Sequence, residues 1–120
     1  MTKTYSIGTP GQKWGEEEKK QWLAAQTIKR SYQDEVVAKL KELPDGLILH
    51  QYGALPYDED KYPLYFIRSE AWSDDKQTIL VTGGVHGYET SGVQGAILFA
   101  KTEATKYLDK FNFLIAVCVS

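Results

Sequence analysis

Two apolar, strand-like runs with a helix-like run between them constrain the fold of this chain most strongly. Residues 78–82 (TILVT) and residues 112–119 (NFLIAVCV) are rich in β-branched and apolar side chains, which favours strands buried on both faces. Between them, residues 89–108 carry apolar residues at helical spacing, namely Val93, Ala96, Ile97, Ala100 and Ala104. Strand, helix and strand predict a βαβ unit with parallel strands and a right-handed crossover.

The preceding half of the chain predicts an arm followed by one long helix. Residues 1–15 are rich in Gly, Thr and Pro and read as an irregular arm. Residues 16–43 open with three glutamates, which suit the positive end of a helix dipole. Apolar residues then recur at helical spacing, namely Ile28, Tyr32, Val36, Leu40 and Leu43. We expect this helix to pack on the outside of a sheet.

Two further strands complete the expected architecture. Residues 47–52 and 64–69 have strand-like composition, and a turn-rich segment joins them, so they predict an antiparallel pair. The whole therefore predicts an α/β fold over residues 47–120, with a mixed, largely parallel sheet flanked by helices. The length of 120 residues allows one domain. Because Ser120 follows directly on a strand of buried type, we expect either that the chain is the N-terminal part of a larger fold or that something else covers this edge.

Composition narrows the classes of function. Fourteen Lys and Arg against sixteen Asp and Glu give a formal charge of −2, and without a basic stripe this argues against a nucleic-acid partner. The single cysteine, Cys118, excludes an intrachain disulfide and a Cys-rich zinc site. No signal sequence and no apolar run of the ~20 residues that a membrane span needs are visible. A soluble cytoplasmic protein with no membrane partner is expected.

His86 and Glu89 are the candidate metal ligands. They lie three residues apart, just beyond a predicted strand, where open α/β sheets bind ligands. Gly83, Gly84 and Gly87 remove side chains around the histidine, so a ligand can approach. Zinc accepts a neutral imidazole and a carboxylate, and catalytic sites often combine two His and one Glu with an open position. Spacing alone leaves the alternative of an ordinary turn histidine and an ordinary helix-start glutamate.

Two glycines lie inside the predicted helix that follows. Gly92 and Gly95 each cost about 1 kcal/mol there relative to alanine. A close approach of this helix to its neighbours would explain both residues.

Other reactive side chains have weaker support. Tyr88, between the two candidate ligands, is either a substrate-pocket residue or a packing aromatic. Cys118 lies in an apolar strand, which predicts an inert buried thiol, and His50 is expected to be a structural histidine on a strand. Ser91 lacks the Gly-x-Ser-x-Gly elbow of a serine hydrolase.

At these residues the chain resembles the zinc carboxypeptidases, the carboxypeptidase A-like superfamily that includes the succinylglutamate desuccinylase and aspartoacylase branch. The similar stretch is ILVTGGVHGYETSGVQGAILFA, residues 79–100, where the family's His-x-x-Glu motif falls on His86 and Glu89. The resemblance implies that these are the first two Zn²⁺ ligands. It also implies hydrolysis of a peptide or amide bond next to a free carboxylate, through a zinc-bound water with a glutamate as general base.

Several parts of the family's site have no counterpart in this chain. The third ligand and the general base are expected downstream, and Arg30 and Arg68 match none of the family's arginine positions. We therefore expect the 120-residue chain alone to be inactive. Three functions stay open: a peptidase, an amidase acting on N-acyl amino acids or murein peptides, and a non-catalytic binding domain derived from such an enzyme. The expected substrate is a peptide or an N-acyl amino acid.

Overall fold

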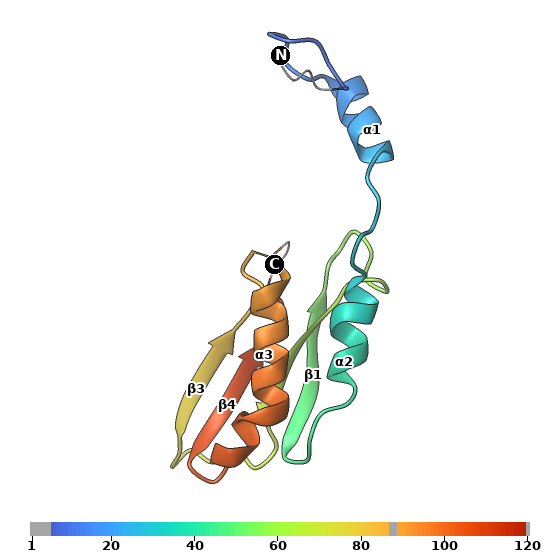
Figure 1. Ribbon diagram of the computed structural model, residues 1–120. Coiled ribbons are helices and arrows are strands. Elements are labelled where there is room, and N and C mark those ends of the chain that lie inside the picture. The colour runs from blue at the N-terminus through green and yellow to red at the C-terminus, as the bar shows by residue number, and fades with distance from the viewer. Residues whose placement is uncertain (1–5, 87–88, 120) are drawn as a thin grey trace.

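The computed structural model describes residues 6–86 and 89–119, which contain one four-stranded mixed sheet with helices packed on it (Figure 1). The strands are β1 (Leu47–Ala54), β2 (Pro63–Ser69), β3 (Gln77–Thr82) and β4 (Phe111–Ala116). Their spatial order is β1-β2-β4-β3. The predicted α/β class, a mixed sheet flanked by helices, is confirmed.

The prediction of a largely parallel sheet is wrong for the described strands. β1 pairs with β2 and β2 pairs with β4 in antiparallel fashion, and only β3 and β4 are parallel. The reason lies in the connections. A short loop can join only antiparallel neighbours, whereas a parallel pair needs a crossover of a dozen or more residues. Only the segment between β3 and β4 contains such a crossover helix in the described chain.

The βαβ unit is present with shorter elements than predicted. The crossover helix is α3 (Thr90–Thr102), and a 3₁₀ turn, η2 (Ala104–Tyr107), follows it. The predicted helix over residues 89–108 is therefore two elements, and the predicted strand over 112–119 ends at Ala116. The predicted apolar face is confirmed, since all five of its residues are buried.

The single helix predicted over residues 16–43 is wrong. The chain forms α1 (Glu16–Ala24), then a non-helical segment, then a π-helical turn, η1 (Gln33–Val37), that runs into α2 (Ala38–Leu40). Figure 1 shows α1 standing apart from the sheet, while α2 lies beside β1. The predicted first-turn glutamates are confirmed in α1.

The break in this helix has a physical cause. Leu23 and Ile28 are 68% and 69% exposed, so continuing the helix through this segment would bury no apolar surface there. Helical structure resumes after Ser31, whose hydroxyl accepts the Asp34 N–H at 3.3 Å and whose carbonyl accepts the Glu35 N–H at 2.8 Å. The predicted apolar stripe is therefore real only beyond this point.

Strand β3 is not buried on both faces, contrary to prediction. It lies at an edge of the described sheet, and the side chain of Leu80 is 65% exposed. Ile79 and Val81, which alternate with it, pack against the core. An apolar run cannot distinguish a central strand from an edge strand whose second face is open.

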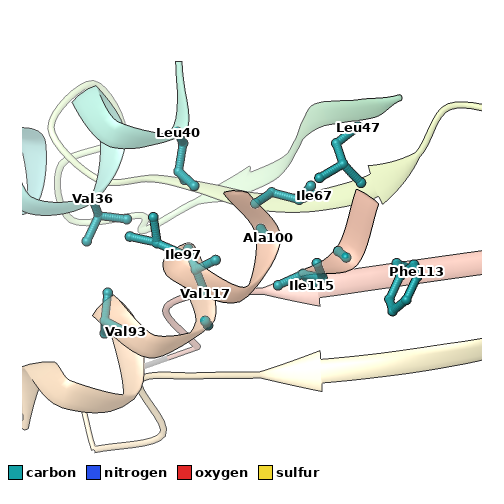
Figure 2. Close-up of a cluster of buried hydrophobic side chains, with 12 residues drawn as sticks. Val36, Leu40, Leu47, Ile67, Val93, Ile97, Ala100, Phe113, Ile115 and Val117 are labelled. Carbon is teal, nitrogen blue, oxygen red and sulfur yellow. The ribbon is translucent and has the colours of Figure 1, made fainter. Parts of the chain in front are cut away.

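The core lies between the sheet and the helices (Figure 2). Figure 2 shows side chains of α3 facing those of β2 and β4, and Val36 and Leu40 approach from the η1–α2 segment. Phe113 at the centre of β4 is 1% exposed, and its ring meets that of Phe99 edge-on, with centroids 5.9 Å apart. Within the described part of the chain, no helix combines the length and apolarity that crossing a bilayer requires.

Tyr32, at the start of η1, links this segment to the β1–β2 hairpin through a hydrogen bond. Its hydroxyl donates a hydrogen bond to the Pro63 carbonyl oxygen at 2.6 Å. Burial raises the pKa of Tyr32 to about 12, and repulsion from Cys118, Tyr65 and Tyr52 acts in the same direction. Because the folded state holds this proton more tightly than the unfolded chain, its stability contribution is complete below about pH 10 and is lost towards about pH 12.

Replacement of Tyr32 by phenylalanine is expected to have two effects. At pH 7 the Pro63 carbonyl loses its donor, which should cost about 0.5–1.5 kcal/mol of stability. Between pH 10 and pH 12 the variant should lose less stability than the wild type, because the buried phenol is gone. Urea unfolding at pH 7 and pH 11 measures both, with Tyr107→Phe as control, since Tyr107 in η2 is exposed. An alkaline decline as steep in Tyr32→Phe as in the control would contradict this role.

Candidate functional site

A two-glycine turn follows β3 and directs the chain towards α3. The Gly83 N–H donates to the Ala116 carbonyl at 2.8 Å, and the Val119 N–H donates to the Gly83 carbonyl at 3.1 Å. Pairing with the β4 chain therefore continues one residue past the end of β3. Gly84 then has a φ of 64°, in the left-handed region that glycine adopts without steric cost.

Neither glycine of the turn has room for a side chain. A Cβ on Gly83 would lie 2.5 Å from the Gly92 carbonyl oxygen and 2.9 Å from the Ala96 Cβ, both in α3. A Cβ on Gly84 would lie 2.7 Å from Val93 Cγ2. The helix thus packs directly on the turn, and this contact fixes where the first residues of α3 lie.

The two glycines within α3 differ in role. A Cβ on Gly92 would lie 3.3 Å from the Gly84 backbone nitrogen, which confirms the close approach predicted for it. The same prediction for Gly95 is wrong, since a Cβ there would meet no atom within 4 Å. Gly95 is exposed, on a side of the helix that faces no neighbour.

His86 and Glu89 lie at the two ends of a tight turn. The Glu89 N–H donates to the His86 carbonyl oxygen at 3.0 Å. Glu89 occupies the N-cap position of α3, but its side chain makes no capping hydrogen bond. Both side chains are exposed, and both line one hollow of about 260 Å³ together with Thr82 and the turn glycines. The backbone therefore brings His86 and Glu89 to the same hollow.

The side chains of His86 and Glu89 are of types that bind zinc, but they supply only two ligands. Imidazole nitrogen and carboxylate oxygen are both common zinc ligands. Across residues 6–86 and 89–119, no cluster of three or more His, Cys, Asp or Glu side chains could hold an ion. The positive end of the α3 dipole opposes a cation near this turn, so the charge of Glu89 is needed to offset it. A metal held here would need further ligands beyond His86 and Glu89.

The other predicted residues lie elsewhere or remain untested. Tyr88 lies outside the described residues. His50 is on β1, with its ring centroid 4.8 Å from that of Phe66, so it packs on a neighbouring strand and does not line the hollow of His86. Cys118 is half-buried and lies beyond the end of β4, not within a buried strand as predicted. Ser91 lines the same hollow as His86 and Glu89.

The sequence did not predict two further hollows. Both adjoin the first turn of α3 through Thr90, and they are bounded by the segment between α1 and η1 and by the loop between β1 and β2. Arg30 and Tyr62 line both of these hollows. No periodicity could reveal this region, because its residues come from segments of the chain far apart in sequence.

Comparison of the chain with models of known protein families and with curated protein sequences gives no match. The zinc-carboxypeptidase resemblance therefore remains an expectation based on residues 79–100.

Proposed function

We propose that the turn carrying His86 and Glu89 is a zinc-binding element of a metallocarboxypeptidase-like hydrolase. The reaction proposed is cleavage of a peptide or amide bond next to a free carboxylate. The observation that carries the proposal is the hollow at the carboxyl end of β3, which His86 and Glu89 both line. Zinc, when bound, would supply Lewis-acid activation of a water molecule and of the scissile carbonyl.

The chain's own residues have separate roles in this proposal. His86 contributes a neutral nitrogen ligand, and Glu89 contributes both a ligand oxygen and the negative charge that makes a cation acceptable near the start of α3. Gly83 and Gly84 hold the turn against α3, which limits the positions that both ligands can take. Substrate reaches this surface from solvent, since both candidate ligands are exposed.

One observation favours a second candidate, a non-catalytic binding domain derived from such an enzyme. The described residues contain neither a third ligand close to the pair nor a further cluster that could complete the site. Under this alternative the hollow would bind a ligand without cutting it, and metal would be dispensable.

Zinc content tests the proposal. The protein is dialysed against zinc, and the bound metal is measured by elemental analysis. We expect His86→Ala to lower zinc affinity by about tenfold or more, because the loss of even an outer-shell partner costs 10–100-fold. His50→Ala is the matched control, since it removes the chain's other histidine without touching the hollow. Equal zinc content in wild type and His86→Ala would refute the site.

Hydrolysis separates the two candidate functions. We expect no zinc-dependent amide hydrolysis by this chain alone, because a two-ligand site lacks the remaining parts of the machinery. An activity that requires zinc and disappears in His86→Ala would contradict that expectation and establish a complete site. Zinc binding at His86 without hydrolysis supports the metal element, and zinc-independent ligand binding alone supports the binding domain.

A further inference from the structure

The outer edge of β3 has none of the features that usually protect an exposed strand edge. β3 lies at one end of the described sheet and pairs with β4 in unbroken register, and Figure 1 shows no described element on its outer side. The other edge strand, β1, has a register shift between Gln51 and Gly53, and such a bulge disrupts edge pairing. The sequence of β3, QTILVT, contains no charge and no proline. This edge is therefore open to pairing with another strand.

The backbone along β3 directs hydrogen-bonding groups outward at every second residue. The N–H and the C=O of Gly83 both bond to the β4 chain, through Ala116 and Val119. Because successive strand residues point their backbone groups alternately to the two sides, the groups of Ile79 and Val81 also point to β4. The residues whose groups point outward are Thr78, Leu80 and Thr82. Each of these three residues offers one donor and one acceptor.

The side chains of β3 leave this edge accessible. Leu80 is 65% exposed, and Thr78 and Thr82 are exposed as well. Ile79 and Val81 alternate with them and pack against the core. A second strand can therefore approach β3 from its outer side without first opening the core.

We propose that this chain forms a symmetric dimer in which β3 pairs in antiparallel fashion with β3 of a second copy. The twofold axis is normal to the sheet and passes between the two Leu80 residues, so Thr78 faces Thr82 and Ile79 faces Val81. Each outward-pointing residue then belongs to a hydrogen-bonded pair, and two bonds for each of the three pairs give about six in all. One continuous sheet runs through both copies.

The occupant is a second copy because β3 is complementary to itself. In this register outward-pointing backbone groups meet each other, and Ile79 meets Val81 on the core face of the combined sheet. A shift of one residue would set inward-pointing groups against outward-pointing ones and would exchange the two faces. No like charges meet, because β3 has no charged residue. A twofold contact requires this self-complementarity.

The dimer also places the second copy beside the hollow of His86 and Glu89. Thr82 is the last residue of β3 and lines that hollow. In an antiparallel pair, the residues that precede β3 in the second copy lie next to this end of the strand. The inference goes beyond the proposed hydrolase and does not rest on it, since the pairing uses β3 and no metal.

Sedimentation velocity of the zinc-free protein, in EDTA, tests the dimer. A contact made by one strand from each copy lies at the small end of specific interfaces, so we expect a dissociation constant on the order of 10 µM. The sedimentation coefficient should rise from that of a monomer to that of a dimer between about 1 µM and about 1 mM. A monomer over this whole range would overturn the proposal.

Leu80→Lys is the decisive variant. It sets two like charges opposite one another at the twofold axis, so we expect the dimer to dissociate at least about tenfold more readily. The core should stay intact, because Leu80 is 65% exposed. Leu98→Lys is the matched control, since it makes the same change at a leucine that is 62% exposed but lies in α3. Equal dissociation constants for the two variants would contradict the pairing.

Amide hydrogen exchange locates the contact. When most of the protein is dimeric, exchange at Thr78, Leu80 and Thr82 should be about tenfold slower than in dilute protein, whereas Ile79 and Val81, already bonded to β4, should change less. A dimer in which those three amides are unchanged would associate through another surface, and this result would also overturn the proposal. His86→Ala should dimerise as the wild type does, so a failed zinc site and a failed dimer give different results.

Discussion

Replacement of Gly83 by alanine is expected to destabilise the protein by about 2–3 kcal/mol, in the upper part of the range for overpacking. The added methyl group would lie 2.5 Å from the Gly92 carbonyl oxygen. The obstructing atom is backbone inside α3, so no side-chain rotation can relieve the contact. Either α3 moves away from the turn or the end of β3 distorts. Both changes displace the residues that line the hollow of His86, so zinc binding should weaken as well.

Gly95→Ala is the matched control for this prediction. It adds the same methyl group to the same unit, three residues past Gly92, where nothing lies within 4 Å. An exposed helical position gains about 0.5–1 kcal/mol when glycine becomes alanine. The two variants should therefore shift the urea midpoint in opposite directions when unfolding is followed by circular dichroism. Equal stability of Gly83→Ala and Gly95→Ala would show that α3 does not pack on the turn.

The sequence predicted the elements that periodicity and turn residues determine. The antiparallel β1–β2 pair and the β3–α3–β4 unit are present, and Val93, Ile97 and Ala100 face the core as their spacing indicated. The type of each element depends on residues close by along the chain, so a local pattern can indicate it.

Two of the errors share a cause, which is that burial is decided by contacts distant in sequence. Ile28 continues the apolar spacing of Val36 and Leu40, yet it is 69% exposed because no part of the described sheet lies opposite it. Leu80 reads as a residue of a central strand, yet its strand lies at an edge. Spacing states which residues share a face, but it does not state whether anything covers that face.

Only part of the candidate site could be predicted from the sequence. The spacing of His86 and Glu89 and the flanking glycines indicated one turn, and in the structure the Glu89 N–H donates to the His86 carbonyl and both residues line one hollow. The hollows around Arg30 were not predictable, because they depend on how the segment before η1 meets the β1–β2 loop.

Loss of either candidate ligand is expected to lower zinc affinity by about tenfold or more, since a first ligand should matter at least as much as an outer-shell partner. Glu89→Gln removes the charge, and it should leave α3 intact because the Glu89 side chain makes no capping hydrogen bond. His86→Ala removes an exposed ring outside the core. Neither change should alter the urea midpoint by much, so a change in affinity would report on the site itself.

The most direct measurement is a double-mutant cycle on zinc affinity with His86→Ala, Glu89→Gln and the combined variant, followed by competition with a zinc-sensitive dye. If both side chains hold one ion, removing the second after the first should cost little, and the coupling should exceed about 1 kcal/mol. Losses that simply add, or affinities that match the wild type, would contradict the claim that this turn aims two side chains at a single cation.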